Sequence, residues 1–529
     1  MVKDEPSDIV AEVTSGYAFS GAALELGALV VDGTARPEAA VRIPLSMVNR
    51  HGLVAGATGT GKTKTLQLMA EQLSAAGVPV LAADIKGDLS GIAQPGEPAE
   101  KTLSRAAEVG QQWTAAGVPV ELLALGGEGE GIPLRATMTS FGPTLLAKVL
   151  DLSEVQESSL GLVFHFADKA GLPMLDLKDL RAVIQYLTSD EGKAELEGLG
   201  ALSKATAGVI LRELIAFDDQ GAGKFFGEPE FDTADLLRVA PDGRGIVSLL
   251  ELPRLADRPR LFSTFLMWLL ADLFHDLPEV GDVDKPKLVF FFDEAHLLFD
   301  DASDAFLEAI AQTVRLIRSK GVGVFFVTQT PKDVPAEVLS QLGNRVQHAL
   351  RAFTPEDAKA LKATASTFPH SSYDLEELLT QLGIGEAVVT VLSERGAPSP
   401  VAWTRLRAPQ SRMAPADPAV LTAAVQGSPL LSKYGEQVDR DSAYERLAAK
   451  LRQAPAPAAP ADQLDPTPEA PAPRKPRRRT TTPRAPKPER STAEQVLGSP
   501  EFRQMARSAA AVVGREIARS IFGTARRRR

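Results

Sequence analysis

The segment Gly56-Ala57-Thr58-Gly59-Thr60-Gly61-Lys62-Thr63 matches every fixed position of the pattern GxxxxGK[ST], which is typical of loops that bind phosphate groups. Glycines allow the backbone of such a loop to curl so that successive N–H groups point at one anion. The helix expected after the loop adds the partial positive charge of its N-terminus. We therefore predict that Lys62 contacts the β- and γ-phosphates of a nucleotide and that the Thr63 hydroxyl ligates Mg²⁺.

The residues on both sides of this loop indicate an α/β fold. An apolar strand is expected at 53–55, and Leu66, Met69 and Leu73 follow the loop at helical spacing. Other short, mostly apolar segments are expected to be strands buried on both faces, as in a mostly parallel sheet covered by helices. These segments are 79–84, 120–125, 246–250, 288–292 and 322–327.

The strand expected at 288–292 ends in two acidic residues, Asp293 and Glu294. We predict that Asp293 holds Mg²⁺ through a water molecule and that Glu294 activates the attacking water as a general base. An apolar strand ending in Asp-Glu is common, so a solvated strand end is the alternative when these residues are considered alone. Their combination with a complete phosphate-binding loop favours the catalytic interpretation.

Polar residues near the next strand suggest two further roles. Gln329, after the strand expected at 322–327, is predicted to sense the γ-phosphate, and a polar strand end is the alternative. Arg315 and Arg318 lie three residues apart on the helix expected before that strand, with no carboxylate one turn away from either. They are candidates for an arginine finger offered to a neighbouring subunit, and a solvated helix face is the alternative.

The composition of the 529 residues, 44% hydrophobic and 24% charged, is that of an ordinary globular protein. The absence of cysteine excludes disulfides and thiolate metal sites. The longest apolar run, 265–271, is much shorter than the roughly 20 residues of a membrane-spanning helix. Acidic residues stand near the N-terminus where a secretory signal would have its apolar core, so a cytoplasmic location is expected by elimination.

The net charge of −10 is unevenly distributed along the chain. Residues 474–529 contain 16 Lys and Arg against 4 Asp and Glu, whereas residues 1–473 contain 42 against 64. The basic end is therefore a candidate contact for a polyanion that the overall charge conceals.

Periodicity and composition divide the chain into seven parts. The strand pattern lapses at 136–235, where apolar residues recur at helical spacing, and the Pro-rich stretch at 453–491 lacks the apolar content of a folded segment. The predicted parts are a short N-terminal β-rich segment (1–45), the first part of an ATPase core (46–135), a mostly helical insertion (136–235), the second part of the core (236–405), a C-terminal helical segment (406–452), a disordered Pro/Ala/Arg-rich linker (453–491) and a basic amphipathic helix (492–529).

The terminal helix is predicted from an apolar stripe with arginines on another face. Its pattern suits DNA phosphates, a partner helix or an acidic membrane surface equally well. The stripe consists of Phe502, Met505, Ala509, Val513, Ile517 and Ile521, and the arginines are Arg503, Arg507, Arg515 and Arg519.

Several segments resemble the HerA-like ATPases, which belong with FtsK to a RecA-like group of hexameric DNA motors. These segments are Asn49-Arg50-His51-Gly52-Leu53-Val54-Ala55 before the loop, Asp293-Glu294-Ala295-His296, and Arg318-Ser319-Lys320-Gly321-Val322-Gly323 before Thr328-Gln329. The resemblance covers roughly residues 10–405 and is closest to a bacterial, YjgR-like branch, in which the stretches at 84–89 and 341–347 look typical. It implies a RecA-like P-loop NTPase core that binds ATP and Mg²⁺ and works as a homo-hexamer on double-stranded DNA, as a helicase or translocase.

The resemblance also implies roles for individual residues. Arg50 falls at a nucleotide-contacting arginine, with a solvated turn residue as the alternative, and Arg318 falls at the arginine that acts on a neighbouring subunit. Asp84 corresponds to an acid near the metal, or to a plain strand end, and Arg345 to a second sensor. The complete predicted nucleotide-binding set is Arg50, Gly56, Ala57, Thr58, Gly59, Thr60, Gly61, Lys62, Thr63 and Lys64, and the predicted catalytic set is Lys62, Glu294, Gln329 and Arg318.

One departure from the family pattern bears on partners. Archaeal HerA carries an N-terminal β-barrel that helps to assemble the ring and docks a nuclease, whereas only about 45 residues precede the core here, too few for a full barrel. Hexamer formation and a nuclease partner are therefore less strongly supported than ATP hydrolysis. Two alternatives to a DNA motor remain: an ATPase that acts on a protein partner, and a nucleotide-gated scaffold anchored to a membrane by its terminal helix.

Overall fold

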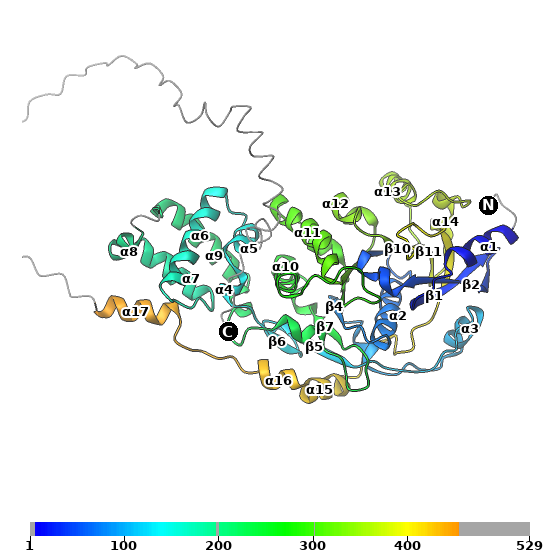
Figure 1. Ribbon diagram of the computed structural model, residues 1–529, viewed down its shortest axis with the longest axis horizontal. Helices are drawn as coiled ribbons and strands as arrows, with labels where there is room; N and C mark the ends of the chain where they lie inside the picture. The colour runs from blue at the N-terminus through cyan, green and yellow to red at the C-terminus, as the bar shows by residue number, and fades with distance from the viewer. Residues whose placement is uncertain (1–5, 197–199, 301, 454–529) are drawn as a thin grey trace, which may run out of the picture.

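The computed structural model describes residues 6–196, 200–300 and 302–453 (Figure 1). The predicted linker at 453–491, apart from Gln453, and the predicted basic helix at 492–529 lie outside the described residues. Among the helices that are described, none combines the length and apolarity needed to cross a membrane.

Twelve strands of the described chain form one sheet in the order β2-β1-β12-β11-β10-β3-β9-β8-β4-β7-β5-β6. The eight strands from β10 to β6 run parallel to their neighbours, and the strands from β11 to β2 pair in antiparallel fashion. The α/β fold with a mostly parallel sheet is therefore confirmed. The strands are β1 (Ala23–Val31), β2 (Thr34–Pro44), β3 (Gly52–Ala55), β4 (Val80–Asp84), β5 (Val120–Leu125), β6 (Ile132–Leu134), β7 (Val247–Glu251), β8 (Leu288–Phe292), β9 (Val322–Thr328), β10 (Asn344–Gln347), β11 (Glu386–Thr390) and β12 (Ala402–Leu406).

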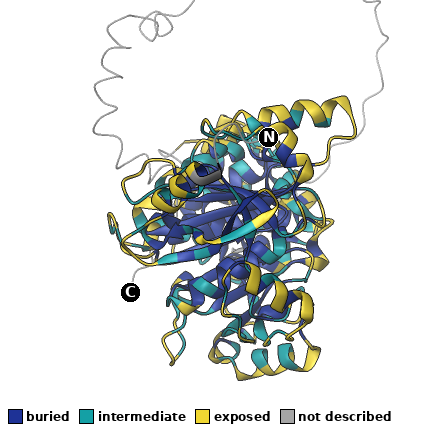
Figure 2. Cartoon of the chain, turned by 90° about the vertical axis from the view of Figure 1, so that its right-hand side faces the viewer, coloured by how far each residue is buried: buried dark blue, intermediate teal, exposed yellow. Residues whose placement is uncertain are grey.

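Helices cover both faces of the parallel part of the sheet, and this explains its continuous apolar strands. In β8, Phe290 and Phe292 enter one hydrophobic core, whereas Val289 and Phe291 enter the other. Figure 2 shows the sheet as a buried layer between helices with exposed outer faces. The helices of the sheet region are α1 (Pro6–Gly16), α2 (Lys62–Ala75), α3 (Glu100–Glu108), α10 (Pro259–Asp276), α11 (Asp304–Ile317), α12 (Ala336–Leu339), α13 (Pro355–Ala365), α14 (Leu375–Gln381) and α15 (Pro418–Gly427).

The N-terminal segment contains the strands β1 and β2, and before them the helix α1, which was not predicted from the sequence. Ile9, Val13 and Tyr17 recur at intervals of four residues and are all buried, so the helical face packs on the sheet. After α1, the strands β1 and β2 form a hairpin that joins the large sheet through β12. The segment is thus part of the main domain.

The predicted helical insertion is helical, and it forms a lobe beside the sheet region (Figure 1). Its helix α7 packs against α17, which ends the described chain. The elements of this lobe are α4 (Met138–Phe141), α5 (Pro143–Val149), α6 (Glu154–Lys169), α7 (Leu177–Leu187), α8 (Asp190–Glu195), α9 (Lys204–Asp219) and the C-terminal helix α17 (Ala443–Gln453), while α16 (Pro429–Tyr434) lies beside α15 at β6.

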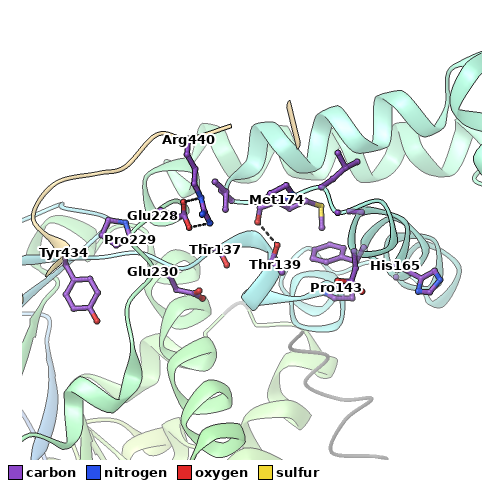
Figure 3. Close-up of a pocket in the computed structure, with 18 of the residues that line it drawn as sticks. Thr137, Thr139, Pro143, His165, Met174, Glu228, Pro229, Glu230, Tyr434 and Arg440 are labelled. Carbon is purple, nitrogen blue, oxygen red and sulfur yellow. Dashed lines mark hydrogen bonds and ion pairs between the residues drawn. The ribbon is translucent and has the colours of Figure 1, made fainter. Parts of the chain in front are cut away.

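The C-terminal segment attaches to the lobe through Tyr434, which is fully buried. Its ring lies 5.1 Å from the ring of Phe231, and its hydroxyl group donates to Asp235 Oδ2 at 2.6 Å and accepts from Asp232 N–H at 3.0 Å. A hollow of about 890 Å³ opens beside this contact, and Arg440 forms an ion pair with Glu228 across its rim (Figure 3). No residue of the phosphate-binding loop lines this hollow.

Candidate nucleotide-binding site

The strand order brings the predicted site residues to one edge of the sheet. Strand β9 lies between β3, which leads into the phosphate-binding loop, and β8, which leads into Asp293 and Glu294. All three strands are parallel, and their registers pair Ala55 with Thr328 and Phe292 with Phe326. The loop, the two acids and the Thr328-Gln329 end therefore emerge side by side, because parallel strands end at the same edge.

The loop follows β3 in a curled path that its glycines permit. Gly56 N–H donates to Thr328 O at 3.2 Å, and Gly61 caps α2 with a φ of 115°, in the left-handed region. A Cβ atom on Gly56 would lie 2.4 Å from the Cβ of His348, which is buried below the loop. The N–H groups of the first turn of α2 have no partner within the helix, so they are available to an anion.

Lys62 lies within the loop and is buried. Its ammonium group donates to Gly56 O at 2.7 Å and Ala57 O at 3.2 Å. Burial lowers the pKa of Lys62, while the negative charges of Glu294 and Asp293 oppose this shift. The charges of Glu294 and Asp293 therefore act on Lys62, as expected if all three residues surround one phosphate site.

The two other polar residues at the start of α2 differ in their surroundings. Thr63 is half-buried in the first turn of α2. The Lys64 side chain turns along the helix and donates to Gln67 Oε1 at 3.2 Å. The ammonium group of Lys64 is thus bonded within the helix, whereas its main-chain N–H belongs to the first turn of α2, which has no partner within the helix.

Asp293 has the surroundings of a metal ligand. The residue is 3% exposed, its Oδ1 accepts Glu294 N–H at 3.0 Å, and its Oδ2 is buried with no hydrogen-bond partner in the described chain. Burial, and then the charge of Glu294, raise the pKa of Asp293 to about 7. A divalent cation at Oδ2 would satisfy the buried oxygen and offset the cost of its charge.

Magnesium fits this site as an ion shared with phosphate. No group of three or more His, Cys, Asp or Glu among the described residues is arranged to hold a metal by itself. Mg²⁺ is commonly held by one or two protein oxygens, with phosphate oxygens and water completing the shell. Thr63 and Asp293 would supply the protein ligands.

Glu294 is buried in an unusual backbone conformation. Its φ of 47° and ψ of 50° are left-handed, which costs a non-glycine residue roughly 1–2 kcal/mol. Its Oε1 forms an ion pair with Lys86, and its Oε2 lies 3.4 Å from His296 Nδ1. Burial raises the pKa of Glu294, but the hydrogen bond and charge of Lys86 outweigh this effect and the pKa is lowered overall. The carboxylate is therefore ionised at neutral pH.

Two residues at this edge were not predicted from the sequence. Lys86 follows β4 and contacts the catalytic candidate Glu294, and His348 follows β10 and lies 2.9 Å from Thr65 Oγ1 through its Nε2. Burial lowers the pKa of His348 to about 4, so the ring is neutral at the base of the loop. Asp84 ends β4 and accepts the N–H groups of Gly87 and Leu89, and its place near the metal stays a prediction.

The end of β9 presents one exposed and one buried polar residue. Thr328 is buried and donates to Asp333 Oδ2 at 2.7 Å, while Gln329 is exposed. Gln329 is therefore placed between the loop and the two acids, with its side chain free to reach a bound phosphate.

Three predicted arginines lie away from this edge. Arg50 precedes β3 and forms an ion pair with Asp282 at 3.2 Å. The whole of β3 therefore separates Arg50 from the loop, a length of about 13 Å at roughly 3.3 Å per residue. Arg318 is exposed in the turn before β9, and Arg345, near the start of β10, donates to Thr367 O at 2.9 Å. The structure does not bring Arg50 to the nucleotide loop of its own chain, because Arg50 precedes β3, nor Arg345 to the γ-phosphate end, because Arg345 lies at the start of β10.

Arg315 and Arg318 differ from the prediction in one detail. Helix α11 ends at Ile317, and Arg318 begins a short 3₁₀ turn, so the two arginines are not on one continuous helix. Arg315 is exposed and lines a hollow that also contains Glu308 and Glu337. Arg318 thus stands in the turn before β9, at the end of the sheet opposite the loop.

A complete phosphate-binding loop, with an acidic pair two strands away in a parallel sheet, defines a P-loop nucleoside-triphosphatase fold. The model of the "Helicase HerA-like C-terminal" family matches residues 30–529, so the chain belongs to this family. The YjgR-like branch stays a prediction. The family and the fold together support an ATPase.

Curated relatives carry related names. The DNA double-strand break repair helicase HerA of Saccharolobus solfataricus is 21% identical over 354 residues, which cover 66% of this chain and 63% of that protein. A probable helicase of Methanocaldococcus jannaschii is 31% identical over 153 residues, 27% of this chain and 28% of that one. The chain thus spans less than two thirds of the length of these relatives.

Solved structures share the fold. The plasmid coupling protein TrwB, in complex with the non-hydrolysable ATP analogue ADPNP, matches with a TM-score of 0.50 and 16% identity over 76% of this chain and 98% of that one. The unbound monoclinic form of the conjugative coupling protein TrwB gives the same TM-score and identity over 78% and 94%.

Proposed function

We propose that this chain hydrolyses ATP with Mg²⁺ and uses the energy to move along double-stranded DNA as a ring of identical subunits. The observation that carries the proposal is the meeting of Lys62, Asp293, Glu294 and Gln329 at one sheet edge. A polyphosphate on the loop would have its terminal group directed towards these acids, since β9 and β8 follow β3 across the sheet.

Each residue at the edge has a separate task in hydrolysis. The main-chain N–H groups of 58–64 and the Lys62 ammonium bind the phosphates, and Glu294 accepts a proton from the attacking water. Thr63 and Asp293 would hold Mg²⁺, which, when bound, neutralises charge that develops on the phosphate oxygens. Gln329 contacts the γ-phosphate and changes its contacts once that phosphate has left.

The placement of the arginines supports a ring. Arg318 and Arg50 stand at the end of the sheet opposite the loop of their own chain. Val280 N–H donates to Ser319 O, and Arg50 pairs with Asp282, so the segment 280–282 lies beside both arginines. An arginine at that edge serves a nucleotide only if the nucleotide belongs to another subunit. In a cyclic ring with head-to-tail interfaces, one edge of each subunit faces the opposite edge of its neighbour.

DNA is proposed as the track on the strength of the family and of relatives named as DNA repair helicases. Basic side chains such as Lys332 and Arg351 are exposed in the loops that follow β9 and β10, at the same edge as the site. Phosphate contacts of this kind would follow the backbone without reading bases.

The proposal is tested by measuring ATP hydrolysis with and without duplex DNA at several salt concentrations. We expect stimulation of at least threefold at low salt, which falls as salt rises because phosphate contacts are screened. Lys62→Ala should abolish hydrolysis in both conditions. A rate that is indifferent to DNA at every salt concentration would contradict the DNA track, and a Lys62→Ala variant with the normal rate would contradict the site itself.

The second candidate is an ATPase that acts on a protein partner. The excess of acidic residues in 1–473, 64 against 42 basic ones, favours it, because a DNA surface needs local positive charge. In that case hydrolysis would be stimulated by a protein component and would not respond to duplex DNA. The third alternative, a membrane-anchored scaffold, depends on residues 492–529, which lie outside the described chain.

A further inference from the structure

The Glu294 carboxylate contacts Lys86 and His296, and no role proposed so far explains the contact with Lys86. Lys86 belongs to the turn after β4, and its ammonium group contacts Glu294 Oε1 across 208 residues of sequence. The Lys86 side chain is 47% exposed, whereas the Glu294 side chain is 6% exposed. A solvent-facing lysine thus reaches inward to a buried carboxylate at the reacting edge.

The turn that carries Lys86 is held by a buried carboxylate. Asp84 Oδ1 accepts Gly87 N–H at 2.7 Å, and Asp84 Oδ2 accepts Leu89 N–H at 2.9 Å. Gly87 has a φ of 74°, which suits glycine in this sharp turn. Because β4 pairs in register with β8, Ala83 opposite Phe292, the fixed turn stands directly beside the acidic pair. Lys86 is therefore aimed at Glu294 by the backbone.

The two oxygens of Glu294 have different surroundings. Oε1 is taken by Lys86. Oε2 lies 3.4 Å from His296 Nδ1 and is buried with no hydrogen-bond partner among the described residues. Lys62, in the phosphate-binding loop, donates to carbonyl groups of that loop. Only one oxygen of the carboxylate is thus left to accept a proton from water.

We propose that Lys86 is the positioning residue of the general base: it anchors Oε1 of Glu294 so that Oε2 faces the attacking water. The proposal rests on the proposed ATP hydrolysis. In that step the water oxygen forms a bond to the γ-phosphorus, and the water proton passes to Oε2. The bond between the γ-phosphorus and the bridging oxygen breaks, and ADP leaves with the electron pair. Lys86 itself gives and takes no proton.

The test compares Lys86→Ala and Lys86→Arg in two backgrounds, the natural chain and Glu294→Gln. Single-turnover hydrolysis of ATP gives the chemical rate, and fluorescence titration with a labelled ATP analogue and Mg²⁺ gives the affinity. Lys224→Ala is the matched control, because Lys224 also pairs with a glutamate, Glu128, but lies outside the site.

In the natural background we expect Lys86→Ala to lower the hydrolysis rate at least tenfold and to change the affinity less than threefold. Lys86→Arg should recover part of the rate, since it restores a cation in reach of Oε1. In Glu294→Gln, removal of Lys86 should cause no further loss, because no base remains to be positioned. Lys224→Ala should hydrolyse ATP at the natural rate.

Three results would overturn the inference. They are a normal rate in Lys86→Ala, an equal loss of rate in both backgrounds, and a loss of affinity that accounts for the whole effect, which would assign Lys86 to the phosphate instead. If Lys86→Ala unfolds in a thermal melt, the Arg variant and its Glu294→Gln double variant carry the same comparison. A dead Lys62→Ala beside a normal Lys86→Ala would leave the proposed function intact and remove only this inference.

Discussion

At the scale of single residues, the nucleotide-binding site contains several buried polar groups, each of which would lower the stability of the fold if it had no ligand to bind or reaction to perform. Asp293 has a buried oxygen without a hydrogen-bond partner in the described chain, Glu294 has a left-handed backbone conformation, and Lys62 is buried against carbonyl groups. Such groups persist where the surrounding structure holds them for a ligand or a reaction. Gly56 shows most directly how little room the arrangement leaves.

Gly56→Ala should weaken nucleotide binding at least tenfold and lower the free energy of unfolding by about 1–3 kcal/mol. The added Cβ would lie 2.4 Å from the Cβ of His348, which cannot move away because its ring is buried. Gly59→Ala is the control, since a Cβ there meets nothing within 4 Å and only the φ of 80° is strained. Nucleotide titration and chemical denaturation measure both effects, and equal behaviour of the two variants would contradict the steric explanation.

At the scale of elements, two attachments define the molecule outside the sheet. The helix α1 packs its buried face on the sheet, and the C-terminal helices α16 and α17 run from the sheet region to the helical lobe (Figure 1). The second attachment depends on Tyr434, whose ring and hydroxyl group both have partners in the lobe. We therefore expect this residue to control the lobe more than the ATPase core.

Tyr434→Ala should cost about 3–5 kcal/mol locally, because it removes a buried aromatic side chain and leaves the Asp235 carboxylate without this donor. Hydrogen exchange should become faster at 228–237, while the ATPase rate stays within twofold of the natural rate, since the hollow beside Tyr434 contains no residue of the phosphate-binding loop. Tyr444→Ala, at a half-exposed position, is the control and should leave the exchange pattern unchanged. Unchanged exchange in Tyr434→Ala would contradict the attachment.

At the scale of the whole molecule, titration of buried groups couples stability to pH. His51 is fully buried, its Nδ1 accepts Val324 N–H at 3.1 Å, and burial lowers its pKa to about 4 from an ordinary value of 6.5. Between these values the unfolded chain binds a proton that the folded chain does not. The contribution of His51 to stability is therefore present above pH 6.5 and is lost as the pH falls towards 4, by up to about 1.4 kcal/mol per pH unit.

This effect is measured as a difference between variants, because Asp293, whose pKa is raised to about 7, acts in the opposite direction. His51→Asn removes the titrating ring and keeps a residue that tolerates the φ of 59°. We expect denaturation free energies of the natural chain to fall more steeply between pH 6.5 and 5 than those of His51→Asn. His165→Asn, at an exposed position, is the control. If the free energy of unfolding depended on pH in the same way in the natural chain, His51→Asn and His165→Asn, the prediction would be contradicted.

Assembly into a ring predicts that defects in two subunits compensate one another. Arg318→Ala and Glu294→Gln should each hydrolyse ATP at less than a tenth of the natural rate. In an equal mixture, about a quarter of the subunit interfaces combine an intact Glu294 with an intact Arg318 from the neighbour. The mixture should therefore be several times more active than either variant alone. Absence of recovery after subunit exchange would contradict an arginine that acts between subunits.

The sequence by itself determined the α/β class, the phosphate-binding loop and the pair Asp293-Glu294, because these depend on local pattern: continuous apolar strands, glycine spacing and acids at a strand end. It did not identify α1, although the spacing of Ile9, Val13 and Tyr17 carried the signal. The roles proposed for the site residues stay predictions that the experiments above test.

Only the tertiary structure decided which edge each polar residue occupies. The contact between Lys86 and Glu294 joins residues 208 positions apart, and His348 reaches Thr65 across 283. The parallel strands also place Arg50, Arg318 and Arg345 at the end of the sheet opposite the loop, because all three lie before or at the start of their strands, although Arg50 is only six residues from Gly56. The physical reason is that pairing between distant strands sets which side chains meet, and no local sequence pattern records that pairing.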